Sequence, residues 1–130
     1  MANISCFEDL EIWQLSRIIG KKVFEMTNNP PFSKDFKFVS QIRSAVGSVM
    51  DNIAEGFERD GRKEFIQFLY IAKGSSGEAR SQSYRAFDFN YISQDTLDEL
   101  KEKTNEISSE IGNFIKYLKN SELKGAKFKK

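Results

Sequence analysis

The residues most suggestive of chemistry lie in the segment GSSGEARS, at positions 74–81. Glycines and serines close together are typical of loops that bind phosphate through backbone N–H groups. A P-loop, however, has the pattern G-x-x-x-x-G-K-[ST] after a β-strand. Gly74 and Gly77 are three positions apart, and Glu78 follows where a lysine is needed. The spacing and the charge therefore exclude a P-loop.

The segment that begins at Asp88 has the carboxylates of a calcium-binding loop but not its spacing. Its sixth position, where such a loop needs glycine, is Ser93, and Ile92 occupies a ligand position. An EF-hand site is therefore excluded.

Residues that could catalyse a reaction are scarce. The chain has no histidine, and its one cysteine, Cys6, consequently has no histidine to activate it. Glu55 and Glu78 are the carboxylates expected near apolar faces, where they could do acid–base chemistry. Helical bundles more often use such groups for hydrogen bonds and for pairing between helices. We therefore predict a protein that is not an enzyme and that has no metal site, cofactor or small-molecule substrate.

The composition predicts a soluble, cytoplasmic protein. The chain has 130 residues, of which 39% are hydrophobic and 30% charged, and its net charge of +1 creates no global field for nucleic acid or membranes. It shows no signal sequence and no apolar run long enough to span a membrane, and its single cysteine fits a reducing compartment. We expect one helical domain over residues 1–120. Residues 121–130 should form a basic, flexible tail, whose lysines could attract polyanions but more simply aid solubility.

Hydrophobic spacing steps between three and four along four segments, which is typical of near-parallel helices packed in a bundle. Ser40 is expected to cap the second helix, Gly61 to begin the third and Ser93 to cap the fourth. The fold class is therefore all-α, an antiparallel up-and-down four-helix bundle without a sheet. The predicted helices lie near residues 9–27, 40–57, 62–90 and 94–119.

The same periodicity indicates that the GSSG segment is helical. The stripe of the third helix passes through it in phase, with members Phe65, Phe68, Ala72, Ser75, Ala79, Gln82 and Ala86. Each glycine inside a helix costs about 1 kcal/mol relative to alanine, and small side chains let two helices approach closely. We therefore expect Gly74 and Gly77 inside the helix, packed against a neighbouring helix. A kink at the glycine–serine pair is the alternative.

Several motifs in residues 40–82 are more distinctive than periodicity requires. They are Gln41-Ile42-Arg43-Ser44-Ala45, Asn52 to Gly56, Lys63-Glu64-Phe65, and Ala72 to Ser75 followed by Glu78. Together with Phe7-Glu8-Asp9-Leu10, Trp13 and the Tyr91-Ile92-Ser93 turn, they resemble the family named after the 23S rRNA intervening-sequence protein, over about residues 7–119. Ser44 departs from the arginine usual in that family. The motif residues expected to join helices are Asn52, Glu55, Gly56, Gly74, Ser75, Gly77 and Glu78.

The resemblance implies an antiparallel four-helix bundle that forms a homo-oligomer, with a pentamer favoured because some members assemble that way. Some family genes lie within insertions in ribosomal RNA operons. A related protein, the accessory variability determinant of diversity-generating retroelements, binds a reverse transcriptase and nucleic acid. Possible partners are therefore further copies of the chain, nucleic acid or a reverse transcriptase. The resemblance supplies no catalytic residue.

Basic residues could contact nucleic acid or another partner. Lys73 and Arg80 share a helix face because they are seven positions apart, and Tyr70 or Tyr84 could stack on bases. The alternative is a solvated surface whose cations pair with neighbouring carboxylates. The candidate residues are Arg43, Arg59, Arg62, Lys63, Lys73, Arg80 and Arg85.

Helix lengths give a second reason to expect self-assembly. The third and fourth helices should be longer than the first two, so apolar residues at their ends would lack a cover within the chain. The connecting segment with Phe32, Phe36 and Phe38 could instead fold back over them. The residues concerned are Phe87, Phe89, Tyr91, Ile111, Phe114 and Leu118.

The sequence thus favours a non-enzymatic, self-assembling scaffold or accessory factor for a protein or ribonucleoprotein. Direct nucleic-acid binding through basic helix faces is the alternative. A small-molecule enzyme, which would need a pocket with a perturbed carboxylate, is the third possibility.

Overall fold

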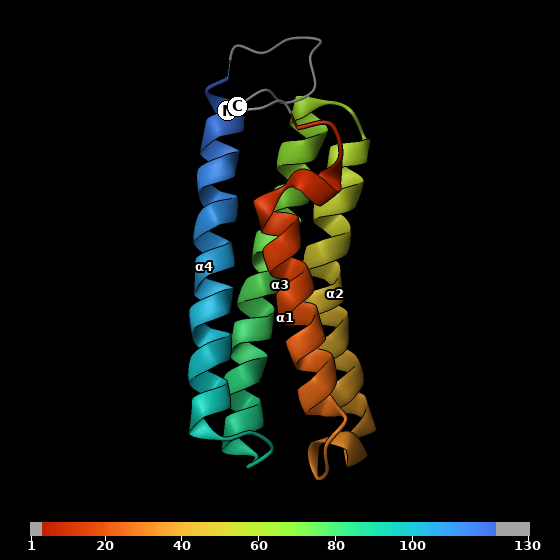
Figure 1. Cartoon of the computed structure of the whole chain (residues 1–130), viewed down its shortest axis with the longest axis vertical. Helices are drawn as coiled ribbons and strands as arrows, with labels where there is room; N and C mark the ends of the chain where they lie inside the picture. The colour runs from red at the N-terminus through yellow and green to blue at the C-terminus, as the bar shows by residue number, and fades with distance from the viewer. Residues whose placement is uncertain (1–3, 122–130) are drawn as a thin grey trace.

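The computed structural model describes residues 4–121, which form four α-helices and two short 3-10 helices. Consecutive α-helices run antiparallel, and the described residues contain no strand (Figure 1). This confirms the predicted all-α, four-helix bundle. The α-helices are α1 (Glu11–Thr27), α2 (Phe36–Glu58), α3 (Arg62–Asp88) and α4 (Gln94–Lys119), and the 3-10 helices are η1 (Phe7–Asp9) and η2 (Phe32–Lys34).

The core forms where one apolar stripe from each helix meets the others. Two of its polar members are satisfied within their own helix: the Thr104 hydroxyl donates to the Leu100 carbonyl at 2.7 Å, and the Ser16 hydroxyl donates to the Trp13 carbonyl at 2.7 Å. Within residues 4–121, no helix combines the length and the apolar character that a bilayer span requires. The largest fully buried side chains include those of Phe32, Ile42, Ile53, Phe57, Phe65, Leu69, Ile107 and Ile111.

Helix α2 begins four residues earlier than predicted. Its N-cap is Asp35, whose carboxylate accepts the Phe38 N–H at 3.2 Å, so Ser40 lies inside the helix rather than capping it. Asp35 also accepts the Tyr91 hydroxyl at 2.8 Å, and this hydrogen bond raises the pKa of the Tyr91 phenol. The Asp35 carboxylate thus caps the N-terminus of α2 and links it by a hydrogen bond to the turn between α3 and α4.

The GSSG segment lies inside α3, as its phase predicted, and α3 is one uninterrupted helix from residue 62 to residue 88. The prediction that Gly74 and Gly77 pack against a neighbouring helix is wrong. A Cβ built at either glycine meets no atom of a neighbouring element within 4 Å. The serines between them make the contacts instead. The Ser75 hydroxyl lies 2.8 Å from the Ser48 hydroxyl of α2, and the Ser76 hydroxyl is hydrogen-bonded to that of Ser108 on α4.

Gly56 is the glycine that allows a close approach of two helices. It is buried inside α2, two residues before the helix ends. A Cβ added there would lie 2.6 Å from Phe68 Cβ and 3.0 Å from Phe65 Cδ1, both on α3. Glycine at this position therefore sets how closely α2 and α3 pack.

The apolar ends of α3 and α4 are covered within the chain, which contradicts the length argument for self-assembly. Phe32 stacks on Tyr91 with ring centroids 4.9 Å apart, and Phe38 contacts Phe89 at 6.0 Å. The segment before α2 thus folds back over the α3–α4 turn, and both lie at the same end of the bundle (Figure 1). Of the six residues expected to be uncovered, Ile111, Phe114 and Leu118 are buried, Phe87 and Tyr91 are half-buried and Phe89 stays exposed.

Candidate nucleic-acid interface

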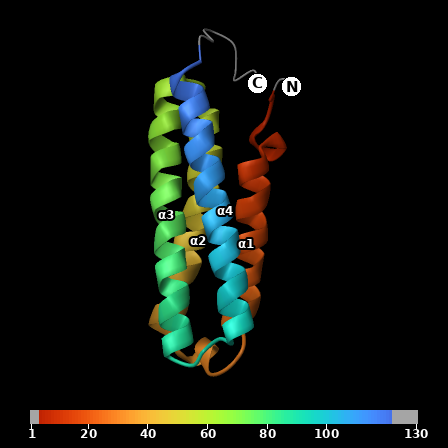
Figure 2. The same cartoon turned by 90° about the vertical axis from the view of Figure 1, so that its left-hand side faces the viewer.

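Three cations gather where α3 and α4 lie side by side (Figure 2). Lys73 and Arg80 of α3 and Lys116 of α4 line a groove of about 250 Å³ between the two helices. Helical geometry brings them together because Lys73 and Arg80 are seven residues apart on one face and α4 runs antiparallel to it. Among residues 4–121, no carboxylate lines the groove, and its remaining lining residues are neutral: Asn105, Ser108, Ser109, Gly112 and Asn113.

Arg80 is the most constrained of these cations. Its Nη1 atom is shielded from solvent and donates to no acceptor within residues 4–121. A buried guanidinium nitrogen without an acceptor is energetically costly, so an anionic oxygen in the groove would stabilise it. The groove also makes room for Lys73: a Cβ at position 112 would lie 3.4 Å from Lys73 Cε, where Gly112 leaves space.

An exposed tyrosine with a lysine above its ring flanks the groove at each end. Lys119 Nζ of α4 lies 5.2 Å from the ring centre of Tyr70, and Lys101 Nζ lies 5.2 Å from that of Tyr84. Both tyrosines belong to α3 and are about half exposed, at 49% and 45%. We call the whole surface the basic face; it comprises Tyr70, Lys73, Arg80 and Tyr84 of α3 with Lys101, Lys116 and Lys119 of α4.

The basic face has the chemistry and the length of a single-strand binding surface. Lysine and arginine neutralise phosphates, serine hydroxyls and asparagine amides donate to phosphate oxygens, and exposed aromatic rings stack on bases. Tyr70 and Tyr84 are separated by fourteen residues of helix, about 21 Å at 1.5 Å per residue. At about 3.4 Å per nucleotide, this distance corresponds to roughly six nucleotides.

The other basic residues predicted to bind lie elsewhere and do not form one surface. Arg43 of α2 lies beside the last turn of α1, where it donates to Thr27 Oγ1 at 2.8 Å and lies over the Phe24 ring. Arg59 pairs with Glu55 at 2.8 Å, which is the local charge pairing expected of a solvated surface. Arg43 thus joins α2 to α1, and Arg59 pairs with a carboxylate of the preceding helical turn.

Arg62, Lys63 and Arg85 are also separate from the basic face. Arg62 begins α3 and donates to the Ser121 carbonyl, and Lys63 beside it is exposed. Arg85 lies over the Phe38 ring at 4.4 Å and lines a polar cleft between α2 and α3 together with Glu78.

The motif residues of α2 meet α3 through a short polar network. Asn52 Nδ2 donates to the Ser48 carbonyl at 2.8 Å and lies 2.9 Å from the Ser48 hydroxyl, which in turn contacts Ser75. Glu55 points away from this network, since it is exposed and bound to Arg59. Asn52, Gly56 and Ser75 therefore lie at the α2–α3 contact, whereas Glu55, Gly74 and Gly77 do not make it.

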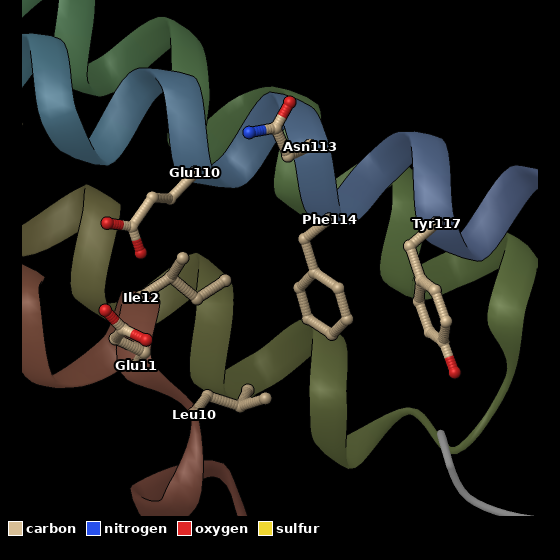
Figure 3. Close-up of a pocket in the computed structure, with 7 residues that line it drawn as sticks. All are labelled: Leu10, Glu11, Ile12, Glu110, Asn113, Phe114 and Tyr117. Atoms are coloured by element: carbon tan, nitrogen blue, oxygen red, sulfur yellow. The ribbon is translucent and has the colours of Figure 1, made fainter. Parts of the chain in front are cut away.

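A second cleft, between the beginning of α1 and the last turns of α4, carries two carboxylates (Figure 3). Glu110 extends from α4 toward α1, where Glu11 begins the helix. Partial burial raises the pKa of Glu110, and the negative charges of Glu11 and Glu106 raise it further. We call this site the acidic cleft; it is lined by Leu10, Glu11, Ile12, Glu110, Asn113, Phe114 and Tyr117.

The acidic cleft meets the geometric condition set above for an enzyme, because it is a pocket with a perturbed carboxylate. Its other walls are mainly apolar, and two like charges beside such walls also suit the binding of a cation. The lone thiol is not activated for chemistry, since a hydrogen bond with Asp9 raises the pKa of Cys6.

Replacing Glu110 by glutamine should stabilise the protein slightly at neutral pH. The pKa of Glu110 is raised on folding above its ordinary value of 4.5, so the folded state loses stability as the pH rises through the raised pKa. Glu110→Gln removes this charge and with it the repulsion from the neighbouring carboxylates. Because solvent screens this repulsion, the free energy of unfolding should rise by only about 0.2–0.5 kcal/mol. Urea unfolding at pH 7 should show this gain, and the two proteins should be equally stable below about pH 4.5. A gain that persists at low pH would mean that charge is not the cause.

Sequence reasoning found part of the basic face and missed the acidic cleft. It placed Lys73 and Arg80 on one face and named both tyrosines, but it did not pair them with Lys101, Lys116 or Lys119. Lys101 is 17 residues from Tyr84 and Lys119 is 49 residues from Tyr70 in the chain, and only the antiparallel packing of α4 brings these lysines close. Glu11 and Glu110 belong to opposite ends of the chain, and no spacing rule connects them.

Comparison with known proteins gives one family and one fold. Residues 8–113 match the family described as 23S rRNA-intervening sequence protein. A crystal structure from Bacteroides thetaiotaomicron VPI-5482, of a protein with unknown function from the S23 ribosomal protein family, is similar with a TM-score of 0.73. The two sequences are 21% identical, and the match covers 81% of this chain and 98% of the other. No curated protein matches the sequence. The family match extends over most of the chain, and the chain therefore belongs to the 23S rRNA-intervening sequence protein family.

Proposed function

We propose that this protein is a non-enzymatic accessory protein that binds single-stranded nucleic acid, RNA in particular, along its basic face. The observation that carries the proposal is the groove between α3 and α4, where three cations converge and the described lining residues include no carboxylate. Such a groove attracts phosphates, and the flanking tyrosines would hold bases by stacking.

Two further points support the proposal. The family description refers to 23S rRNA, and the similar crystal structure is described as a member of an S23 ribosomal protein family, so both names concern ribosomal material. An overall charge of +1 cannot attract nucleic acid by itself, so a locally uncompensated cluster is the feature expected of a binder of this composition. In this role the protein would present RNA to a protein partner, such as a reverse transcriptase, and so act as a ribonucleoprotein scaffold.

The proposal is tested by fluorescence anisotropy with a labelled single-stranded RNA of about twelve nucleotides, long enough to exceed the basic face. Five lysine or arginine contacts predict a salt slope of log K against log[salt] near −3.5, so affinity should fall about a hundredfold between roughly 50 and 200 mM salt. The triple variant Lys73→Ala, Arg80→Ala, Lys116→Ala should lose about two units of that slope and bind roughly ten- to a hundredfold more weakly.

A charge-matched control separates the basic face from charge in general. Lys21, Lys34 and Lys37 are exposed and lie away from the basic face, and replacing all three by alanine removes the same net charge. This control should keep the wild-type slope. Equal weakening by both triple variants, or no salt-dependent binding by the wild type, would contradict the proposal.

We also propose that the protein self-associates, with a pentamer favoured by the family resemblance. The support for self-association is the family resemblance, because the exposed Ile18 and Phe24 of α1 lie about 120° apart around the helix and so form no single apolar patch. Light scattering at micromolar concentration should show a mass several times the 15.0 kDa of one chain. A single 15.0 kDa species would rule out self-association under those conditions.

A further inference from the structure

A polar cleft lies between α2 and α3, on the side of α3 opposite to the basic face. Its volume is about 500 Å³, within the range of sites that hold small ligands. Residues spaced three or four apart share one face of a helix, so each helix presents a row of polar groups to the cleft. The polar groups used below are Ser40, Ser44 and Ser48 of α2 with Glu78, Gln82 and Arg85 of α3.

Gln82, in the middle of the α3 row, has an unpaired hydrogen-bond acceptor. Its side chain lines the cleft but is only 6% exposed, and its Oε1 atom accepts no hydrogen bond within residues 4–121. A buried carbonyl oxygen without a donor is energetically costly, so a ligand N–H in the cleft would stabilise it. In the described part of the chain the other such atom is Arg80 Nη1, which lines the groove of the basic face.

Two opposite charges flank Gln82. Glu78 precedes it by one helical turn and Arg85 follows it by one turn, so about 10 Å of helix separates the two charged residues. Within residues 4–121 neither of them forms an ion pair. The Arg85 guanidinium lies over the buried Phe38 ring at 4.4 Å, which leaves the N–H groups at its edge available to an anion.

We propose that the polar cleft binds a short peptide with free ends, about three residues long. The ammonium group of the peptide would lie at Glu78 and its carboxylate at Arg85. A peptide unit between them would pair with the Gln82 amide, because its N–H and carbonyl complement the acceptor and the donors of that amide. Three extended residues span about 10 Å, which matches the separation of the two charged residues along α3. The Ser40 and Ser44 hydroxyls would donate to the remaining carbonyls of the peptide.

Charge complementarity favours this class of ligand over simpler ones. An inorganic anion would be repelled by Glu78 and a simple cation by Arg85, whereas a neutral sugar would leave both charges unpaired. A zwitterion whose charges lie several ångströms apart satisfies both ends of the cleft. The site is separate from the basic face, so its occupancy does not depend on RNA binding.

The test is an NMR titration of the ¹⁵N-labelled full chain with triglycine at millimolar concentrations. Triglycine should shift the side-chain signals of Gln82 and Arg85, and the shifts should saturate. Acetylation of the peptide removes the ammonium that Glu78 would bind, and amidation removes the carboxylate that Arg85 would bind. Each modification should weaken binding about tenfold.

Two variants with matched controls locate the site. Gln82→Met and Arg85→Met should each weaken triglycine binding about tenfold. Gln67→Met changes an exposed glutamine of the same helix, and Arg17→Met changes an exposed arginine that also lies over an aromatic ring, Trp13. Both controls should bind like wild type. Without peptide, Gln82→Met should keep or raise the melting temperature, because it removes a buried acceptor that has no donor.

Several results would overturn the proposal. Shifts that do not saturate, or equal affinity for the acetylated and amidated peptides, would show that no zwitterion is recognised. Weakening by a control variant as large as that by its partner would place binding outside the cleft. A lower melting temperature of Gln82→Met would mean that the amide oxygen serves the fold and not a ligand. Tighter saturation of the same signals by adenosine monophosphate would assign the cleft to nucleotides instead of peptides.

Discussion

Replacing Phe65 by alanine should lower the free energy of unfolding by about 3–5 kcal/mol, the largest effect expected of any single change considered. Phe65 is fully buried in the first turn of α3. Its ring meets that of Phe57 on α2 edge-to-face at 5.8 Å and that of Phe114 on α4 at 5.5 Å. Alanine would leave a cavity at the point where three helices meet, and it would remove both aromatic contacts.

Urea denaturation followed by circular dichroism measures this effect, and Phe36→Ala provides the matched control. Phe36 is also a phenylalanine in the first turn of a helix, but it is 78% exposed. Its replacement should change stability by no more than about 0.5 kcal/mol. A loss at Phe65 as small as the loss at Phe36 would mean that these three helices do not pack around Phe65 as described.

Replacing Gly56 by alanine should destabilise the protein by about 1–3 kcal/mol, although alanine is the better helix former. The added Cβ would lie 2.6 Å from Phe68 Cβ. Because Phe68 Cβ is attached directly to the α3 backbone, a side-chain rotation cannot relieve the overlap. The two helices would have to move apart, and the nearby contact of Phe57 with Phe65 would loosen.

The same substitution at Gly74 or Gly77 should have the opposite sign. A Cβ at either position meets open space, so only the helix propensity changes, and each alanine should stabilise the protein by about 0.5–1 kcal/mol. Thermal or urea unfolding of the three single variants compares identical chemistry in α2 and α3. Destabilisation at Gly74 or Gly77 would point to a partner, such as another copy of the chain, packed on that face.

Periodicity predicted the helices well because buried positions repeat every three or four residues in a bundle. It placed the beginning of α2 too late because the stripe of the second helix begins only at Val39, and the exposed Phe36 carries no periodic signal. Asp35 and Ser40 are both good capping residues, and only the fold-back of η2 onto Tyr91 selects Asp35. The beginning of α2 thus depends on a tertiary contact, which the spacing of residues in the sequence does not show.

The small residues of α3 show a similar limit. Their phase predicted a continuous helix, but residue size indicates only that a close approach is possible, not which neighbour uses it. Ser75 and Ser76 contact the flanking helices through their hydroxyls, whereas the close steric contact occurs at Gly56. For the basic face, the seven-residue spacing within α3 correctly grouped Lys73 with Arg80. The lysines of α4 could not be added, because their position beside α3 depends on how the two helices are aligned.

The most direct measurement of the central claim is ultraviolet cross-linking of a bound single-stranded RNA, with the cross-linked peptides identified by mass spectrometry. Bases stacked on the basic face would lie against Tyr70 and Tyr84, so peptides containing these tyrosines should carry the RNA. The exposed rings of Phe24 and Phe36 lie on other helices and serve as internal controls. Cross-links concentrated at Tyr70 and Tyr84, and lost at high salt, are the predicted result. Cross-links at Phe24 or Phe36 with none at the two tyrosines would contradict the account.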